Sequence, residues 1–196
     1  MEDLPIGFRA CIYDTNHLNA VIDRMACQAG ALLHGCAKVA IVGVLRRGAP
    51  LADKLTQLLV ERYGLSAPTR LDLLVKRYAD DLTLLYPDTQ LLEDKQAALI
   101  DLAGYTLLIV DDVLYTGHSF LKVLEFFVRK NPERILTACL VDRKVNTVPI
   151  KADIIGVDLQ IAPGDVVECH VPPYEPVFEI QLLKLADKHE AQRGMG

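Results

Sequence analysis

The sequence has no apolar run long enough to cross a membrane, although half of its residues are hydrophobic. A membrane-spanning helix needs about 20 consecutive apolar residues, and the apolar runs here are far shorter. The N-terminal residues, MEDLPIGFRAC, begin with acidic side chains and lack the basic-then-apolar pattern of a secretory signal. We therefore expect a cytoplasmic protein that does not insert into membranes.

Paired cysteine motifs are also lacking. No CxxC pair occurs among the five cysteines, which are Cys11, Cys27, Cys36, Cys139 and Cys169. An odd, scattered set fits neither a disulfide framework nor a zinc site. We expect reduced and mostly buried thiols.

The 196 residues suit one domain and contain no repeat, low-complexity tract or linker. Apolar periodicity predicts helices and buried strands in alternation along most of the chain. The predicted helices cover 14–34, a segment that starts at Pro50 and ends near Gly64, and a segment that starts at about residue 119. The predicted strands cover 38–45, 70–76, 107–110, 134–141, 154–157, 165–171 and 177–182. This alternation indicates a three-layer α/β sandwich with a central parallel sheet, organised as a single domain over 1–196.

The stretch LLIVDDVLYTGHSFLKVL, residues 107–124, has the most informative pattern. Four apolar residues predict a strand buried on both faces, and the acid pair Asp111-Asp112 follows them. A polar turn, residues 116–119, then opens an amphipathic helix. A glycine turn before a helix N-terminus presents free backbone N–H groups to an anion such as phosphate. Because the acid pair suits a diol or a metal ion, the stretch predicts a site for a phosphorylated ribose.

A second polar segment, Arg46-Arg47-Gly48, follows the predicted strand 38–45. Arginine forks and exposed backbone N–H groups bind phosphate oxygens in pairs, so the segment is a candidate diphosphate loop. The alternative is a solvated turn with no ligand.

Residues 77–101 lack a clean period and contain short leucine clusters. A stretch of this length without pattern inside a compact domain is typical of a lid, an arm or a disordered piece.

The residues VDDVLYTG, 110–117, resemble the signature for phosphoribosyl diphosphate (PRPP) of the type I phosphoribosyltransferases. In detail they resemble the bifunctional pyrimidine-operon attenuator and uracil phosphoribosyltransferase family. GVLRRGAPLADKL, LDLLVKRYADDLT, LVDRKVNTVPIKADIIG and DVVECHV are similar to further segments of that family. The resemblance implies the type I phosphoribosyltransferase fold, with a flexible arm at about 77–101. It also implies a small hood, formed by about 143–183 together with the N-terminal segment.

The resemblance also implies roles for individual residues. The residues expected at PRPP are Arg46, Arg47, Gly48, Asp111, Asp112, Val113, Leu114, Tyr115, Thr116, Gly117, His118 and Ser119. Asp111, Asp112 and Arg77 are expected to be catalytic, and Arg143 and Val113 to contact the base. Mg²⁺ is expected near Asp111 and Asp112, held by PRPP oxygens and water, with no direct protein ligand. His118 stands where the family usually has arginine or lysine; it either adds a titratable charge at the phosphate or leaves binding to the backbone amides.

The base is predicted from Tyr115. Purine-using relatives carry an aspartate at this position, which acts on a ring proton. Tyrosine, with an ordinary pKa near 10, is a poor base at neutral pH. We expect uracil as the acceptor, giving UMP and diphosphate. The sequence VKRY before the arm also resembles hypoxanthine-guanine enzymes, so these purines remain the alternative.

Two further hypotheses concern binding without turnover. The resembled family binds a messenger-RNA hairpin through a basic face of its dimer, and relatives assemble as homodimers or larger oligomers. Here 21 Lys and Arg are outnumbered by 26 Asp and Glu, for a net charge of −5. This balance disfavours an RNA-binding regulator relative to an enzyme. A PRPP sensor without chemistry is the remaining hypothesis.

Overall fold

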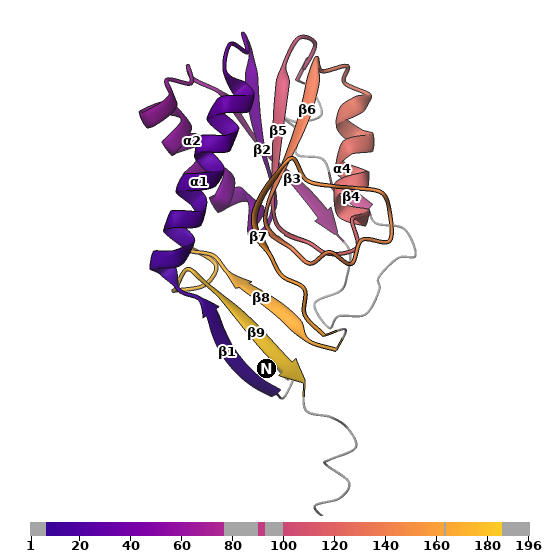
Figure 1. The fold of residues 1–196 in the computed structure, drawn as a ribbon. Coiled ribbons are helices and arrows are strands. Elements are labelled where there is room, and N and C mark those ends of the chain that lie inside the picture. The colour runs from indigo at the N-terminus through magenta and orange to yellow at the C-terminus, as the bar shows by residue number, and fades with distance from the viewer. Residues whose placement is uncertain (1–6, 77–89, 93–99, 163, 186–196) are drawn as a thin grey trace, which may run out of the picture.

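The computed structural model describes residues 7–76, 90–92, 100–162 and 164–185. The helices are α1 (Thr15–Leu33), α2 (Gly48–Tyr63) and α4 (His118–Val128). The strands are β1 (Gly7–Tyr13), β2 (Val39–Leu45), β3 (Thr69–Lys76), β4 (Gln90–Leu92), β5 (Thr106–Leu114), β6 (Arg134–Asp142), β7 (Ile154–Asp158), β8 (Val166–His170) and β9 (Glu179–Leu185). Figure 1 shows a large sheet between helices and a small sheet beneath it.

The large sheet has the strand order β4-β3-β2-β5-β6-β7. The five strands from β3 to β7 in this order are parallel, and β4 adds an antiparallel edge. The central strands β2 and β5 are buried along most of their length, as their continuous apolar sequences predict. This arrangement confirms the predicted central parallel sheet.

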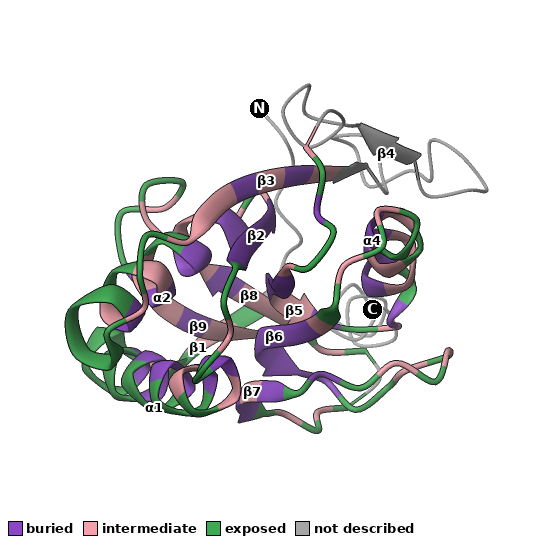
Figure 2. Ribbon diagram, turned by 90° about the horizontal axis from the view of Figure 1, so that it is seen from above, coloured by how far each residue is buried: buried purple, intermediate pink, exposed green. Residues whose placement is uncertain are grey.

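The alternation of side chains along the strands separates two apolar layers. Val39 and Ile41 of β2 pack in one cluster with α1 and α2, whereas Ala40 and Val42 pack in the other with α4. Figure 2 shows α1 and α2 on one side of the sheet and α4 on the other. The predicted three-layer α/β sandwich is therefore confirmed.

The helix ends follow from local sequence. The Asp14 carboxylate accepts a hydrogen bond from the His17 backbone N–H at 2.9 Å and caps α1. Gly64 ends α2 with φ 68°, a left-handed conformation that glycine adopts at little cost. Pro50 is the third residue of α2 and not its first, because the helix already begins at Gly48.

The small sheet has the order β1-β9-β8 and is antiparallel. Ile180 and Cys169 of this sheet join the α1 and α2 cluster. The sequence did not predict β1 as a strand because its large apolar side chains do not mark a buried face. Phe8 is 71% exposed and Ile12 is 36% exposed.

Only part of the predicted arm, residues 77–101, lies within the described residues. Residues 90–92 form β4, a strand that the sequence pattern did not indicate, paired antiparallel with β3. Residues 77–89 and 93–99 lie outside the described part of the chain. Within the described part, no helix is both long and apolar enough to cross a bilayer.

We predict that Phe127→Ala lowers the free energy of unfolding by about 3–5 kcal/mol. Phe127 is fully buried between α4 and the sheet, so its removal leaves a cavity. Val128→Ala is the matched control, because the neighbouring Val128 is 62% exposed; it should change stability by less than about 0.5 kcal/mol. Urea unfolding at pH 7 measures both. Equal losses would contradict the packing of α4.

Candidate active site

The C-terminal ends of β2 and β5 lie side by side in the middle of the sheet. The two strands are paired in register up to Gly43 and Val110. Beyond this pair, β2 leads to Arg46-Arg47-Gly48 and β5 continues with Asp111 and Asp112. The two polar segments predicted from sequence therefore meet at one edge of the sheet, where ligands bind in open α/β folds.

Gly48 determines how closely the two segments approach. A Cβ atom on Gly48 would lie 2.5 Å from the Val110 carbonyl oxygen and 3.1 Å from Asp111 Cα. Both neighbours are backbone atoms of β5, which cannot move aside as a flexible side chain can. Only glycine lets the first turn of α2 contact β5 where the acid pair begins.

The acid pair is part of β5 and does not follow it. The sequence predicted a strand that ends at residue 110, but pairing with β6 continues to Leu114. Asp111 is only 4% exposed, and its Oδ1 accepts a hydrogen bond from the Asp112 backbone N–H at 2.9 Å. Asp112 is half-buried. Burial raises the pKa of the Cys169 thiol in β8, and the nearby carboxylates of Asp112 and Asp111 raise it further. The acids therefore lie close to the small sheet.

The turn after β5, residues 116–119, is the segment predicted to bind phosphate, and it is called the anion cradle here. Gly117 precedes α4 with φ 90°, and a Cβ there would lie 2.8 Å from Val148 Cγ2. Ser119, in the first turn of α4, is 4% exposed, and its hydroxyl oxygen has no hydrogen-bond partner among the described residues. A buried hydroxyl without a partner is costly, which indicates a place for a ligand atom.

The remaining residues of the turn have different surroundings. His118 is exposed, and its Nε2 lies 3.0 Å from the Thr147 hydroxyl. The Thr116 carbonyl accepts a hydrogen bond from the Thr147 backbone N–H. The Leu114 side chain is buried in the core, so only its backbone is available to a ligand. Val113 is half-buried and packs against the α1 and α2 cluster.

The two arginines after β2 have different environments. Arg46 is exposed, with its guanidinium 6.0 Å from the centre of the Tyr174 ring. Arg47 donates from Nε to Glu175 Oε1 at 3.0 Å, and its Nη2 also pairs with that oxygen. Burial alone would lower the pKa of Arg47, but the hydrogen bond and charge of Glu175 outweigh it and leave the pKa raised. Arg47 is therefore cationic at any physiological pH.

Arg143 is a buried cation with few partners. It is 5% exposed, and its guanidinium lies 5.1 Å from the centre of the Tyr115 ring. Nη2 donates to the Asp165 carbonyl at 3.4 Å, a long contact, and Nε has no partner among the described residues. The turn that carries Arg143 is fixed by Lys144, whose Nζ lies 2.8 Å from both Asp142 and Asp158. A buried guanidinium whose Nε–H has no partner among the described residues suits a hydrogen-bond acceptor of a ligand.

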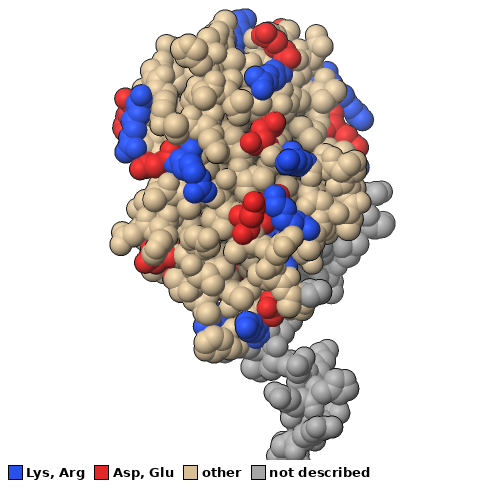
Figure 3. All heavy atoms as spheres, viewed as in Figure 1, with Lys and Arg blue, Asp and Glu red and all other residues tan. Residues whose placement is uncertain are grey.

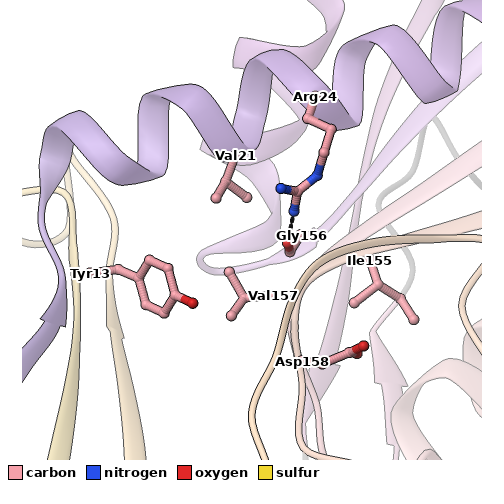
Figure 4. A pocket seen from close by; sticks show the side chains of 7 residues that line it. All are labelled: Tyr13, Val21, Arg24, Ile155, Gly156, Val157 and Asp158. Carbon is pink, nitrogen blue, oxygen red and sulfur yellow. Dashed lines mark hydrogen bonds between the residues drawn. The ribbon is translucent and has the colours of Figure 1, made fainter.

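A separate pocket of about 300 Å³ lies between α1, β7 and the end of β1. In Figure 4, Arg24 reaches across it and donates to the Gly156 carbonyl, with Tyr13 and Asp158 nearby. None of the residues predicted for the ligand site lines this pocket, and its basic and acidic groups already have partners. We assign no substrate to it.

The structure thus brings together the two arginines, Gly48, the acid pair and the anion cradle at one edge of the sheet, with Tyr115 and Arg143 beside them. Arg77 lies outside the described residues. Three contacting residues were not predicted from the sequence: Tyr174 and Glu175, which contact the arginines, and Thr147, which contacts the cradle. No local motif marks these three residues; only the folded contacts identify them.

The sequence profile of the phosphoribosyl transferase domain matches residues 11–175. The bifunctional protein PyrR of Thermus aquaticus is 30% identical over 176 residues, covering 89% of this chain and 96% of the relative. PyrR of Deinococcus radiodurans is 34% identical over 161 residues, covering 82% and 86%. The hypoxanthine phosphoribosyltransferase of Trypanosoma cruzi, in complex with the product IMP, has the same fold, with a TM-score of 0.71 at 17% identity over 94% of this chain and 98% of the other.

We predict that Gly48→Ala lowers the free energy of unfolding by about 1–3 kcal/mol, the usual cost of overpacking. The added methyl group would overlap the β5 backbone at Val110. Gly164→Ala is the control, because a Cβ at Gly164 meets no atom within 4 Å. Urea unfolding of both variants tests the close approach. Equal stability of the two variants would show that the loop after β2 does not rest on β5.

Proposed function

The chain belongs to the phosphoribosyl transferase domain family, and from this premise we propose that it transfers the 5-phosphoribosyl group of PRPP to uracil. The products are UMP and diphosphate. One observation carries the proposal: Gly48 packs against Val110 and Asp111, so a double-arginine loop and an acid pair share one site. A diphosphate and a ribose diol that belong to one molecule need such neighbouring groups.

The anion cradle is proposed to hold the 5′-phosphate. The backbone N–H groups at the start of α4 and the hydroxyls of Thr116 and Ser119 are the donors. The buried Ser119 hydroxyl, which has no partner among the described residues, supports this assignment because a phosphate oxygen would satisfy it.

Asp111 and Asp112 are proposed to bind the ribose hydroxyls. Carboxylate oxygens are also the ligands that Mg²⁺ prefers, so the acid pair fits the ion. Among the described residues, no group of three or more potential ligands could hold a metal by itself. The acids would therefore hold Mg²⁺ through water, and oxygens of the substrate would be its direct ligands. When bound, the ion neutralises charge on the diphosphate.

The chemistry requires positioning and charge stabilisation. The bond between the anomeric carbon and diphosphate breaks with its electron pair on the diphosphate, and a ring nitrogen of the base forms the new bond and loses its proton. No protein nucleophile is needed. Arg46, Arg47 and the Gly48 amide stabilise the leaving charge, and the acid pair orients the ribose.

Arg143 and Tyr115 are proposed to select the base. The buried Nε–H of Arg143 has no partner among the described residues and requires an acceptor, which a carbonyl oxygen of uracil would supply. Tyr115 supplies no carboxylate for a purine ring proton. Because Arg143 also contacts the Asp165 carbonyl just before β8, we propose that the small sheet is the hood that receives the base.

Charge supports catalysis over RNA binding. On the face in Figure 3, Lys and Arg side chains alternate with Asp and Glu side chains and form no continuous basic area. Phosphate-backbone binding depends on clustered positive charge. This face and the net charge of −5 together favour catalysis, so we propose an enzyme first and an RNA-binding regulator as the alternative.

We predict that the purified protein incorporates labelled uracil into UMP when PRPP and Mg²⁺ are present, and prefers uracil to hypoxanthine and guanine. Asp111→Asn and Asp112→Asn should abolish turnover while the fold is kept, as circular dichroism would show. Preference for a purine would overturn the base assignment. Full activity of both variants would overturn the proposed role of the acids.

We predict that Ser119→Ala raises the KM for PRPP about 10- to 100-fold, because a hydrogen bond to a charged group contributes about 1.5–3 kcal/mol. The KM for uracil should stay unchanged. Ser66→Ala, at an exposed position away from the cradle, is the matched control. Steady-state kinetics distinguish the two. An unchanged KM for PRPP in Ser119→Ala would place the phosphate elsewhere.

A further inference from the structure

The segment between β8 and β9, residues 171–178, is called the hood strap here; it contacts the start of α2 at three points. Tyr174 lies under the Arg46 guanidinium at 6.0 Å, and Glu175 pairs with Arg47. The Phe178 ring lies 4.5 Å from Lys54 Nζ. One short segment of the hood thus contacts three cations, Arg46 and Arg47 just before α2 and Lys54 within it.

We propose that Glu175 is a positioning residue, which holds the Arg47 guanidinium in the orientation that binds the leaving diphosphate. The proposal rests on the proposed function of the site. Arg47 contacts the diphosphate, and Glu175 acts only through Arg47.

Glu175 is itself fixed. Its Oε1 accepts from Arg47 Nε at 3.0 Å and also pairs with Nη2, while its Oε2 accepts from the Val171 backbone N–H at 2.8 Å. The Glu175 side chain is 20% exposed. Burial alone would raise the pKa of Glu175, but the hydrogen bonds from Arg47 and Val171 lower it overall. The carboxylate is therefore ionised at neutral pH and anchored at both oxygens.

The contact leaves the phosphate-binding edge of Arg47 open. A guanidinium has five N–H donors, and Glu175 occupies the edge formed by Nε and Nη2. The edge formed by Nη1 and Nη2 remains, and the Arg47 side chain is 38% exposed. This second edge also presents two parallel N–H groups, which can bind two phosphate oxygens. A fixed first edge restricts the rotamers of Arg47 before the ligand arrives, so less conformational entropy is lost on binding.

The small sheet supplies a matched ion pair that does not touch the diphosphate loop. Arg9 Nε lies 2.9 Å from Glu168 Oε2, and the two side chains are 31% and 21% exposed. The Arg47–Glu175 side chains are 38% and 20% exposed. Removing either acid should therefore cost the small sheet a similar amount of stability, but only Glu175 contacts an arginine of the site.

The experiment compares Glu175→Ala and Glu168→Ala with the full chain. Calorimetry measures the Kd of inorganic diphosphate with Mg²⁺, and kinetics measure KM for PRPP and uracil. Glu175→Ala should weaken diphosphate binding and raise the KM for PRPP about 10- to 100-fold, the range expected when a binding group is misplaced. The KM for uracil should not change, and Glu168→Ala should match the wild type in all three constants.

A double-mutant cycle separates positioning from general damage. In an Arg47→Ala background, Glu175→Ala should have no further effect on diphosphate binding, because its action passes through Arg47. Glu175→Gln keeps the shape of the side chain and one acceptor oxygen, and should show a smaller loss. It also serves as the test variant if Glu175→Ala does not fold.

Two results would overturn the inference. Unchanged diphosphate binding in Glu175→Ala or Glu175→Gln would show that Arg47 needs no support. Tighter binding would show that Glu175 competes with the diphosphate for Arg47. Failure of the proposed function looks different, because the wild type itself would then bind diphosphate without converting PRPP and any base to nucleotide.

Discussion

The close contact between two backbones underlies the whole site. Gly48, at the start of α2, rests on the β5 backbone at Val110 and Asp111. Every other group of the site is placed relative to this contact. The arginines lie just before Gly48, the acid pair begins at the contact itself, and the anion cradle follows the end of β5. The contact at Gly48 thus places the two arginines next to the acid pair, and these charges form the candidate site.

Sequence patterns predicted the centre of the large sheet well because β2 and β5 are buried on both faces. Continuous apolar runs such as VAIVGVL leave few alternatives, and parallel strands separated by helices follow from them. The meeting of Arg46-Arg47-Gly48 with the acid pair was also predictable, since parallel strands end at a common edge. Their shared register at Gly43 and Val110 is what places them together.

The small sheet was harder to predict, because its strands are half-exposed and come from distant parts of the chain. Phe8 in β1 faces solvent, and the partners of β1 lie in β9. Apolar periodicity indicates only which nearby residues are buried, so it could predict neither β1 nor the pairing of β1 with β9. The same applies to Glu175: an isolated acid after two prolines has no pattern, and its contact with Arg47 arises only in the folded chain.

The pairing of β1 with β9 has a consequence for biosynthesis. Gly7 lies opposite Leu185, so β1 leaves the ribosome well before its partner β9 has been synthesised. Contacts between such distant segments carry a large loop-closure entropy and form late in folding. The large sheet is assembled from segments that lie closer together in the sequence, so it can form before the small sheet does.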